Sequence, residues 1–95
     1  MTSDDTTRRP QHSQVAASRI FGDETVIISP GENVVRMLNP TASRIWELSD
    51  GKHTLHEIAV ELTAEFNVEF SQANRSVNSF VYELIQRGLL VWSSE

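Results

Sequence analysis

Apolar and polar positions in the first half of the chain alternate with a period of about two, which is typical of β-strands. Short β-branched and apolar runs are interrupted by turn residues at Gly22-Asp23 and Pro30-Gly31. Because tight turns join antiparallel neighbours, the pattern predicts an antiparallel meander of three strands. The expected strands are Val15–Phe21, Glu24–Ser29 and Val34–Leu38.

Beyond the third strand the apolar positions recur every three or four residues, as they do on the buried face of a helix. Asn39-Pro40 pairs a good N-cap with a proline suited to the first helical position, so a helix is expected to start there. Asp50-Gly51 supplies the turn that ends it. Thr54 and Glu57 have the spacing of a capping box and predict a second helix that runs to Phe66.

A third and longest helix is predicted after a loop over Asn67–Phe70, whose two apolar residues are expected to anchor in the core. Ser71 is the expected N-cap, and Gly88 is placed to stop the helix. Leu89–Trp92 is expected to be a strand or an extended segment packed on the core. The apolar stripe of this helix consists of Ala73, Val77, Phe80, Val81, Leu84 and Ile85.

The order of elements predicts an α+β domain with a winged-helix-like outline, in which an N-terminal three-stranded antiparallel sheet precedes a three-helix bundle. Residues 1–13 are polar and lack large apolar side chains apart from Met1, so they are predicted to form a disordered tail. Residues 14–95 are predicted to form a single domain.

The amino-acid composition argues against several classes of function. The 95 residues include no cysteine, so disulfides and cysteine-based zinc sites are excluded. No apolar run approaches the roughly 20 residues that cross a bilayer, and no signal sequence is present, so a cytoplasmic protein with no membrane partner is predicted. The net charge of -5, from 13 acidic and 8 basic residues, argues against nucleic acid as a partner.

Candidate chemistry is sparse. His53 and His56 form an H-x-x-H pair, but metal binding needs further converging ligands, so neither a metal nor a cofactor is predicted. The four glycines are isolated and do not form a phosphate-binding loop. No serine or threonine has the histidine and aspartate partners of a nucleophile. The sequence therefore predicts a protein that is not an enzyme.

The winged-helix outline suggests DNA binding as one possible function. The exposed side of the third helix does not favour it, because one arginine and one glutamate are a poor surface for reading a groove. That side carries Asn74, Arg75, Asn78, Ser79, Tyr82, Glu83 and Gln86. The other alternative is a structural module that dimerises, so a monomer and a weak homodimer both remain open.

The predicted third strand has apolar residues on both faces. Val34, Arg36 and Leu38 share one face, while Val35 and Met37 lie on the other. An antiparallel sheet usually has one solvated face. Either a helix covers one face and a few side chains are exposed on the other, or a partner covers part of this surface.

Several short motifs follow one another in a fixed order and spacing. They are Leu38-Asn39 at the strand end, Ile45-Trp46-Glu47-Leu48 with Asp50-Gly51 at the first helix end, Thr54–Ile58 in the second helix, and Leu84 with Gly88-Leu89-Leu90 at the end of the third. Together they resemble the PqqD family over roughly Val15 to Trp92.

The resemblance implies a peptide-binding adaptor without catalysis or cofactors. Such domains bind the leader of a ribosomally synthesised precursor peptide and present it to a modifying enzyme. In pyrroloquinoline quinone synthesis this is a radical SAM protein, and related domains serve lasso-peptide and other pathways. The leader is expected to add as a strand to the third strand, in a groove closed by the third helix.

By position, the resemblance predicts a binding surface made of the third strand and one side of the third helix. Arg36 is expected either to pair with an acidic leader side chain or to be solvated. The opposite flank of the helix, with Ser76, Glu83 and Arg87, is the alternative wall. The predicted peptide-binding residues are Val34, Val35, Arg36, Met37, Leu38, Asn74, Asn78, Val81, Tyr82 and Ile85.

Overall fold

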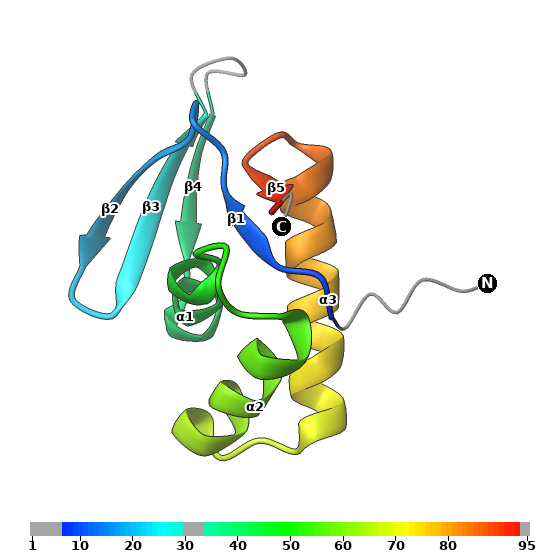
Figure 1. Ribbon diagram of the computed structural model, residues 1–95. Coiled ribbons are helices and arrows are strands. Elements are labelled where there is room, and N and C mark those ends of the chain that lie inside the picture. The colour runs from blue at the N-terminus through cyan, green and yellow to red at the C-terminus, as the bar shows by residue number, and fades with distance from the viewer. Residues whose placement is uncertain (1–6, 30–33, 94–95) are drawn as a thin grey trace.

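The computed structural model describes residues 7–29 and 34–93, in which the predicted strands and helices follow in the predicted order after one additional short strand. Figure 1 shows a three-stranded sheet standing beside a bundle of helices. The predicted α+β fold, with an antiparallel sheet followed by three helices, is confirmed. The elements are β1 (Pro10–His12), β2 (Ala17–Phe21), β3 (Glu24–Ser29), β4 (Val34–Leu38), α1 (Pro40–Leu48), α2 (Leu55–Phe66), α3 (Phe70–Gln86) and β5 (Leu90–Trp92).

The sheet β2-β3-β4 is an antiparallel meander in sequence order, so the three predicted strands are confirmed. Gly22 has a φ of +65°, which a residue without Cβ adopts at no steric cost, and it closes the two-residue turn between the paired Phe21 and Glu24. The predicted turn at residues 30–33 lies outside the described residues.

β2 begins at Ala17 rather than at the predicted Val15. Ser13 turns the chain just before it, because its carbonyl accepts the Ala16 N–H at 3.2 Å and its hydroxyl accepts the Val15 N–H at 3.2 Å. Val15 therefore belongs to a turn and its side chain is exposed.

Two predicted helix starts are confirmed. The Asn39 side-chain oxygen accepts the Ala42 N–H at 2.8 Å, and Pro40 is the first residue of α1. At α2, the Thr54 hydroxyl accepts the Glu57 N–H at 3.1 Å, while the Glu57 carboxylate accepts the Thr54 N–H at 2.9 Å. These contacts satisfy backbone donors that have no partner inside a helix.

α3 begins at Phe70, so the prediction of Ser71 as its cap is wrong. Glu69 is the N-cap and makes no side-chain capping bond. The reason is the short connection, in which Asn67 ends α2 with a φ of 55° and turns the chain quickly into α3. Phe70 lies against the His56 ring and is 40% exposed, so it does not anchor in the core as expected.

The N-terminal segment differs from the predicted tail. Residues 1–6 lie outside the described residues. Pro10–His12 form β1 and pair with β5, so the prediction that the tail is disordered as far as residue 13 is wrong for these three residues. The segment is held by backbone groups that apolar periodicity does not reveal. The Pro10 carbonyl accepts the Gly51 N–H at 2.7 Å, and the Arg9 carbonyl accepts the Ser93 N–H at 2.7 Å.

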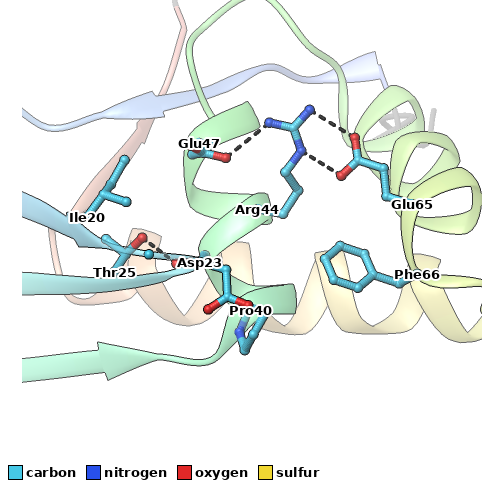
Figure 2. A pocket seen from close by; sticks show the side chains of 10 residues that line it. Ile20, Asp23, Thr25, Pro40, Arg44, Glu47, Glu65 and Phe66 are labelled. Carbon is cyan, nitrogen blue, oxygen red and sulfur yellow. Dashed lines mark hydrogen bonds and ion pairs between the residues drawn. The ribbon is translucent and has the colours of Figure 1, made fainter.

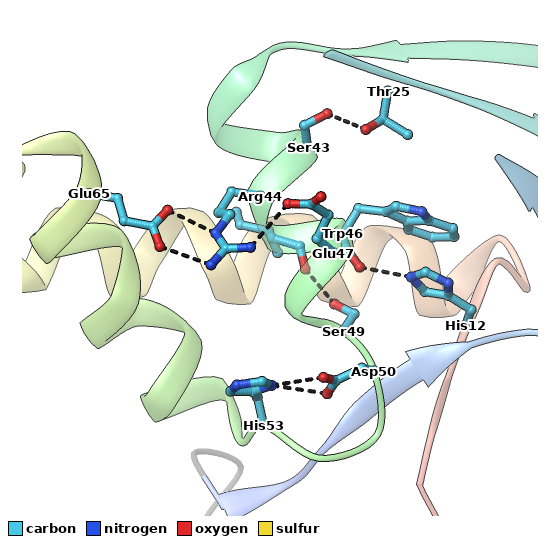
Figure 3. Close-up of polar contacts among 11 residues, drawn as sticks. His12, Thr25, Ser43, Arg44, Trp46, Glu47, Ser49, Asp50, His53 and Glu65 are labelled. Carbon is cyan, nitrogen blue, oxygen red and sulfur yellow. Dashed lines mark hydrogen bonds and ion pairs between the residues drawn. The ribbon is translucent and has the colours of Figure 1, made fainter. Parts of the chain in front are cut away.

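Trp46 joins β1 and β2 to α1. The His12 ring stacks on the Trp46 ring with centroids 3.8 Å apart, and His12 Nε2 donates to the Trp46 carbonyl at 2.8 Å (Figure 3). On the other side, Trp46 Nε1 donates to the Ser18 hydroxyl at 3.2 Å. Trp46 itself is buried.

The core lies between the inner face of the sheet and the helices. Val68 packs against it, as predicted, and Gly88, with a φ of +75°, ends α3 as predicted. The buried hydroxyls of Thr25 and Ser43 form a hydrogen bond that joins β3 to α1 (Figure 3). The buried apolar residues are Ile27, Leu38, Ile45, Trp46, Leu48, Leu55, Ile58, Ala59, Leu62, Ala73, Val77, Val81, Leu84, Leu89 and Leu90.

Candidate functional site

β4 is an edge strand. It pairs with β3 on one side, and no other strand in the described part of the chain pairs with its second side. Figure 1 shows this strand on the side of the sheet nearest the helices. An open edge carries unpaired backbone donors and acceptors, to which another strand can bind.

The strand register shows which residues direct these groups outward. Phe21 and Glu24 flank a two-residue turn and therefore exchange backbone hydrogen bonds. Glu24 therefore directs its backbone groups toward β2. Because successive residues of a strand direct these groups to opposite sides, Ile27, three residues further along β3, directs them toward β4. Arg36 pairs with Ile27 and so forms its backbone hydrogen bonds with β3. The backbone N–H and C=O groups of its neighbours on either side, residues 35 and 37, therefore point toward the open edge.

The side chains of β4 divide between the two faces of the sheet. Leu38 is buried under the helices, and Arg36 is half-buried on the same face. Val35 and Met37 are 64% and 70% exposed on the opposite face. The helices thus cover one face of the strand, and coverage of the other face by a partner stays a prediction. The Val34 side chain lies outside the described residues.

The flank of α3 that faces β4 is marked by an ion pair. The Arg36 guanidinium donates to Glu83 Oε2 at 2.9 Å, across the gap between strand and helix. Arg87, one turn further on, also contacts Glu83 Oε2, at 3.4 Å. The flank given as the alternative from sequence, with Ser76, Glu83 and Arg87, is therefore the one that meets β4.

The predicted flank of α3 lies on its other side. Tyr82 packs edge-on against Trp92 of β5, with ring centroids 5.4 Å apart. Asn78, one turn earlier, donates to the Asn74 carbonyl at 2.7 Å. The structure thus does not bring Asn74, Asn78 and Tyr82 together with β4, and their role in peptide binding stays a prediction.

The two apolar residues predicted for the groove wall lie deeper in the molecule. Val81 is fully buried in the core, and Ile85 is half-buried beside it. Both support the packing of α3, and neither is among the residues that line the clefts described below.

A cleft of about 300 Å³ opens where β4 ends, between α1, the end of α2 and α3. Six of its ten lining residues are apolar, four are polar, and none is charged. A shallower hollow continues along α3, shares Ser76 and Phe80 with the cleft, and adds Arg75, Ser79 and Glu83. The cleft is lined by Asn39, Thr41, Ala42, Ile45, Leu62, Val68, Gln72, Ala73, Ser76 and Phe80.

A second cleft, of about 330 Å³, lies between the β2–β3 hairpin, α1 and the end of α2 (Figure 2). Arg44 crosses it and donates to both carboxylate oxygens of Glu65, at 2.8 and 2.9 Å, and to Glu47 at 3.1 Å. The hydrogen bonds to Glu65 raise the pKa of Arg44. Because these charges pair with one another, this cluster is best explained as a tie between α1 and α2.

The histidines have contacts that explain them without a metal. His53 Nδ1 lies 3.0 Å from the Asp50 carboxylate, and His56 packs on Phe70. Among the residues described by the structure, no group of three or more His, Cys, Asp or Glu side chains is arranged to hold a metal ion. None of the described helices is both long enough and apolar enough to cross a membrane.

Comparison with known proteins gave one family and similar solved structures. Residues 24–90 match the family model described as coenzyme PQQ synthesis protein D (PqqD). The structure of TbiB1 in complex with the TbiA(beta) leader peptide is 26% identical, covers 84% of this chain and 93% of its own, and has a TM-score of 0.76. No match was found among curated proteins.

The fold is also similar to that of a lasso peptide synthetase B1 complexed with the leader peptide. That structure has a TM-score of 0.76 and 22% identity, and the alignment covers 87% of this chain and 98% of the other.

Proposed function

Because this chain belongs to the PqqD family, we propose that it is a non-catalytic adaptor for a ribosomally synthesised precursor peptide. It binds the leader segment of that peptide as an added strand on β4 and presents it to a modifying enzyme. The observation that carries this proposal is the open edge of β4 beside the cleft at α3.

The edge and the cleft supply different parts of recognition. Backbone groups of Val35 and Met37 give hydrogen bonds that do not depend on the leader sequence. Alternate side chains of the added strand point toward the helices, where the cleft beside Phe80 receives them. Hydrogen bonds at the strand edge supply affinity for the leader, and the cleft fixes the register in which the leader pairs with β4.

The solved structures support this assignment. TbiB1 and the lasso peptide synthetase B1 were both determined with a leader peptide, and both share this fold along most of their length. The partner of this chain is accordingly a precursor peptide, and the second partner is a modifying enzyme such as a radical SAM protein. The product is pyrroloquinoline quinone or a related modified peptide, made in the cytoplasm.

DNA binding is less well supported by the structure. The exposed flank of α3 facing β4 carries Glu83, which holds Arg36 and Arg87 in ion pairs. The net charge of -5 adds repulsion from phosphates.

Proline substitution tests the strand-addition step. Met37→Pro removes one N–H from the open edge of β4, and we expect leader binding to weaken about three- to tenfold, the effect of one lost hydrogen bond. Binding is measured by isothermal titration calorimetry with the leader segment of a candidate precursor peptide from the same gene cluster.

Ile20→Pro is the matched control. By the same alternation, Ile20 directs its N–H to the open edge of β2, on the far side of the sheet. The Ile20→Pro variant should therefore leave leader binding unchanged. Equal binding by wild type and Met37→Pro, with both variants folded by circular dichroism, would rule out strand addition at β4.

A further inference from the structure

We propose that the groove beside β4 selects leader segments in which an apolar side chain and an acidic side chain stand two residues apart. The apolar side chain enters the cleft beside Phe80, and the acidic one pairs with Arg36. This inference rests on the proposed function and adds the class of sequence that the site accepts.

The apolar position follows from the cleft at the end of β4. Ala42, Ile45 and Phe80 form part of its wall, and no charged residue lines it. A volume of about 300 Å³ accommodates a large aliphatic or aromatic side chain. A charged side chain placed there would lose its hydration without gaining an ionic partner.

The acidic position follows from the charges at the other end of the groove. Arg36 and Arg87 both contact Glu83, through the same carboxylate oxygen. Two guanidinium groups on one carboxylate leave a net positive charge there, although the whole chain has a net charge of -5. The groove therefore has local complementarity for an anionic side chain.

Arg36 has the capacity for a second carboxylate. A guanidinium carries five N–H donors, and in the described part of the chain Arg36 forms an ion pair through one nitrogen, with Glu83. Its side chain is 23% exposed, so Glu83 of α3 orients it while part of it still contacts solvent. An incoming carboxylate can pair with Arg36 without displacing Glu83.

The spacing follows from strand geometry. Arg36 and Leu38 share the helix-facing side of β4, and the cleft begins at the next residue, Asn39. Side chains on one face of a strand are two residues, or about 6.8 Å, apart. A strand added alongside thus presents residues i and i+2 to the two ends of the groove. The order of the two residues reports whether the leader runs parallel or antiparallel to β4.

A displayed library of random 12-residue peptides tests the inference with the full-length protein. Panning on wild type should enrich an apolar residue with Asp or Glu two positions away. Panning on Arg36→Gln should keep the apolar residue and lose the acidic one, whereas Glu83→Gln, which removes the competing carboxylate, should strengthen the acidic preference. Arg19→Gln, an arginine on the outer face of the sheet, is the control and should match wild type.

A selected peptide gives the magnitude. Changing its acidic residue to the neutral amide should weaken binding to wild type by about two- to fivefold, the range of a partly exposed ion pair, and should have no effect on binding to Arg36→Gln. Enrichment of apolar residues alone, identical for wild type and Arg36→Gln, would overturn the inference and leave the proposed function standing. No enrichment of any peptide by wild type would overturn both.

Discussion

Asn39 contributes to two features of the molecule at once. Its side chain caps α1 through the Ala42 N–H, and the same residue lines the cleft at the end of β4. Asn39-Pro40 thus sets both the last residue of the strand and the first turn of the helix. The position of α1 relative to the edge of β4, and with it the shape of the cleft, depends on this junction.

Asn39→Ala removes the acceptor of the Ala42 N–H. We expect it to lower the free energy of unfolding by about 1 kcal/mol, the usual value of an N-cap, as measured by urea denaturation. Asn39→Asp retains an oxygen acceptor and should keep most of the stability. An equal loss in both variants would show that capping is not what this side chain contributes.

Asp50 makes the stability of the fold sensitive to acid. Partial burial acts to raise the pKa of its carboxyl, but hydrogen bonds from the His53 ring, at 3.0 Å, and from the Lys52 N–H, at 2.8 Å, outweigh it. The pKa of Asp50 is therefore below its ordinary value. A carboxyl with a lowered pKa stabilises the fold above its unfolded pKa, and this stability is lost as pH falls through the folded pKa.

Asp50→Asn should accordingly be less stable than wild type at neutral pH, by less than about 1 kcal/mol because the side chain is partly exposed. The difference should shrink as pH falls below about 4, the ordinary pKa of an aspartate, and disappear once the wild-type carboxyl is protonated below its lowered pKa. Chemical denaturation across this pH range measures it. A difference that stays constant with pH would contradict the assignment.

Among the elements, β1 is the one that the sequence did not reveal. Its three residues have no apolar period, and Pro10 is the only one that is buried. The segment is held by backbone hydrogen bonds to residues far along the chain and by the stacking of His12 on Trp46. Such contacts depend on the tertiary fold, so local patterns carry no signal for them.

Deletion of residues 1–12 should therefore destabilise the fold by about 2–4 kcal/mol, the sum of several lost hydrogen bonds. The deletion of residues 1–6 spares the residues that contact β5 and serves as the control. Its stability should be closer to that of the wild type. Thermal and urea unfolding compare the two. Equal stability of both deletions would show that β1 contributes nothing to the fold.

The sequence predicted the helices and the meander well because caps, turns and apolar periods are local. Asn39, Thr54 and Gly88 were each assigned their structural role from neighbouring residues alone. The choice of flank on α3 was different, because it depends on how the helix is rotated against β4. The Arg36–Glu83 pair shows which flank faces β4, but the two residues are 47 positions apart in the sequence, which has 13 acidic candidates.

In the whole molecule, the sheet and the helices together create a surface that neither has alone. β4 supplies an open backbone edge, and α1 and α3 supply the adjoining cleft. The Arg36–Glu83 pair connects the two parts and gives the groove its local charge. The core residues that carry the family resemblance hold these parts in place, and the proposed binding surface lies beside them.

The most direct test of this account is an NMR titration of the ¹⁵N-labelled protein with the leader of its precursor peptide. The account predicts amide shifts at Val35 and Met37 together with the β4-facing flank of α3, at Ser76, Ser79 and Glu83. Unchanged spectra with saturating leader, or shifts confined to the flank with Asn78 and Tyr82, would contradict it.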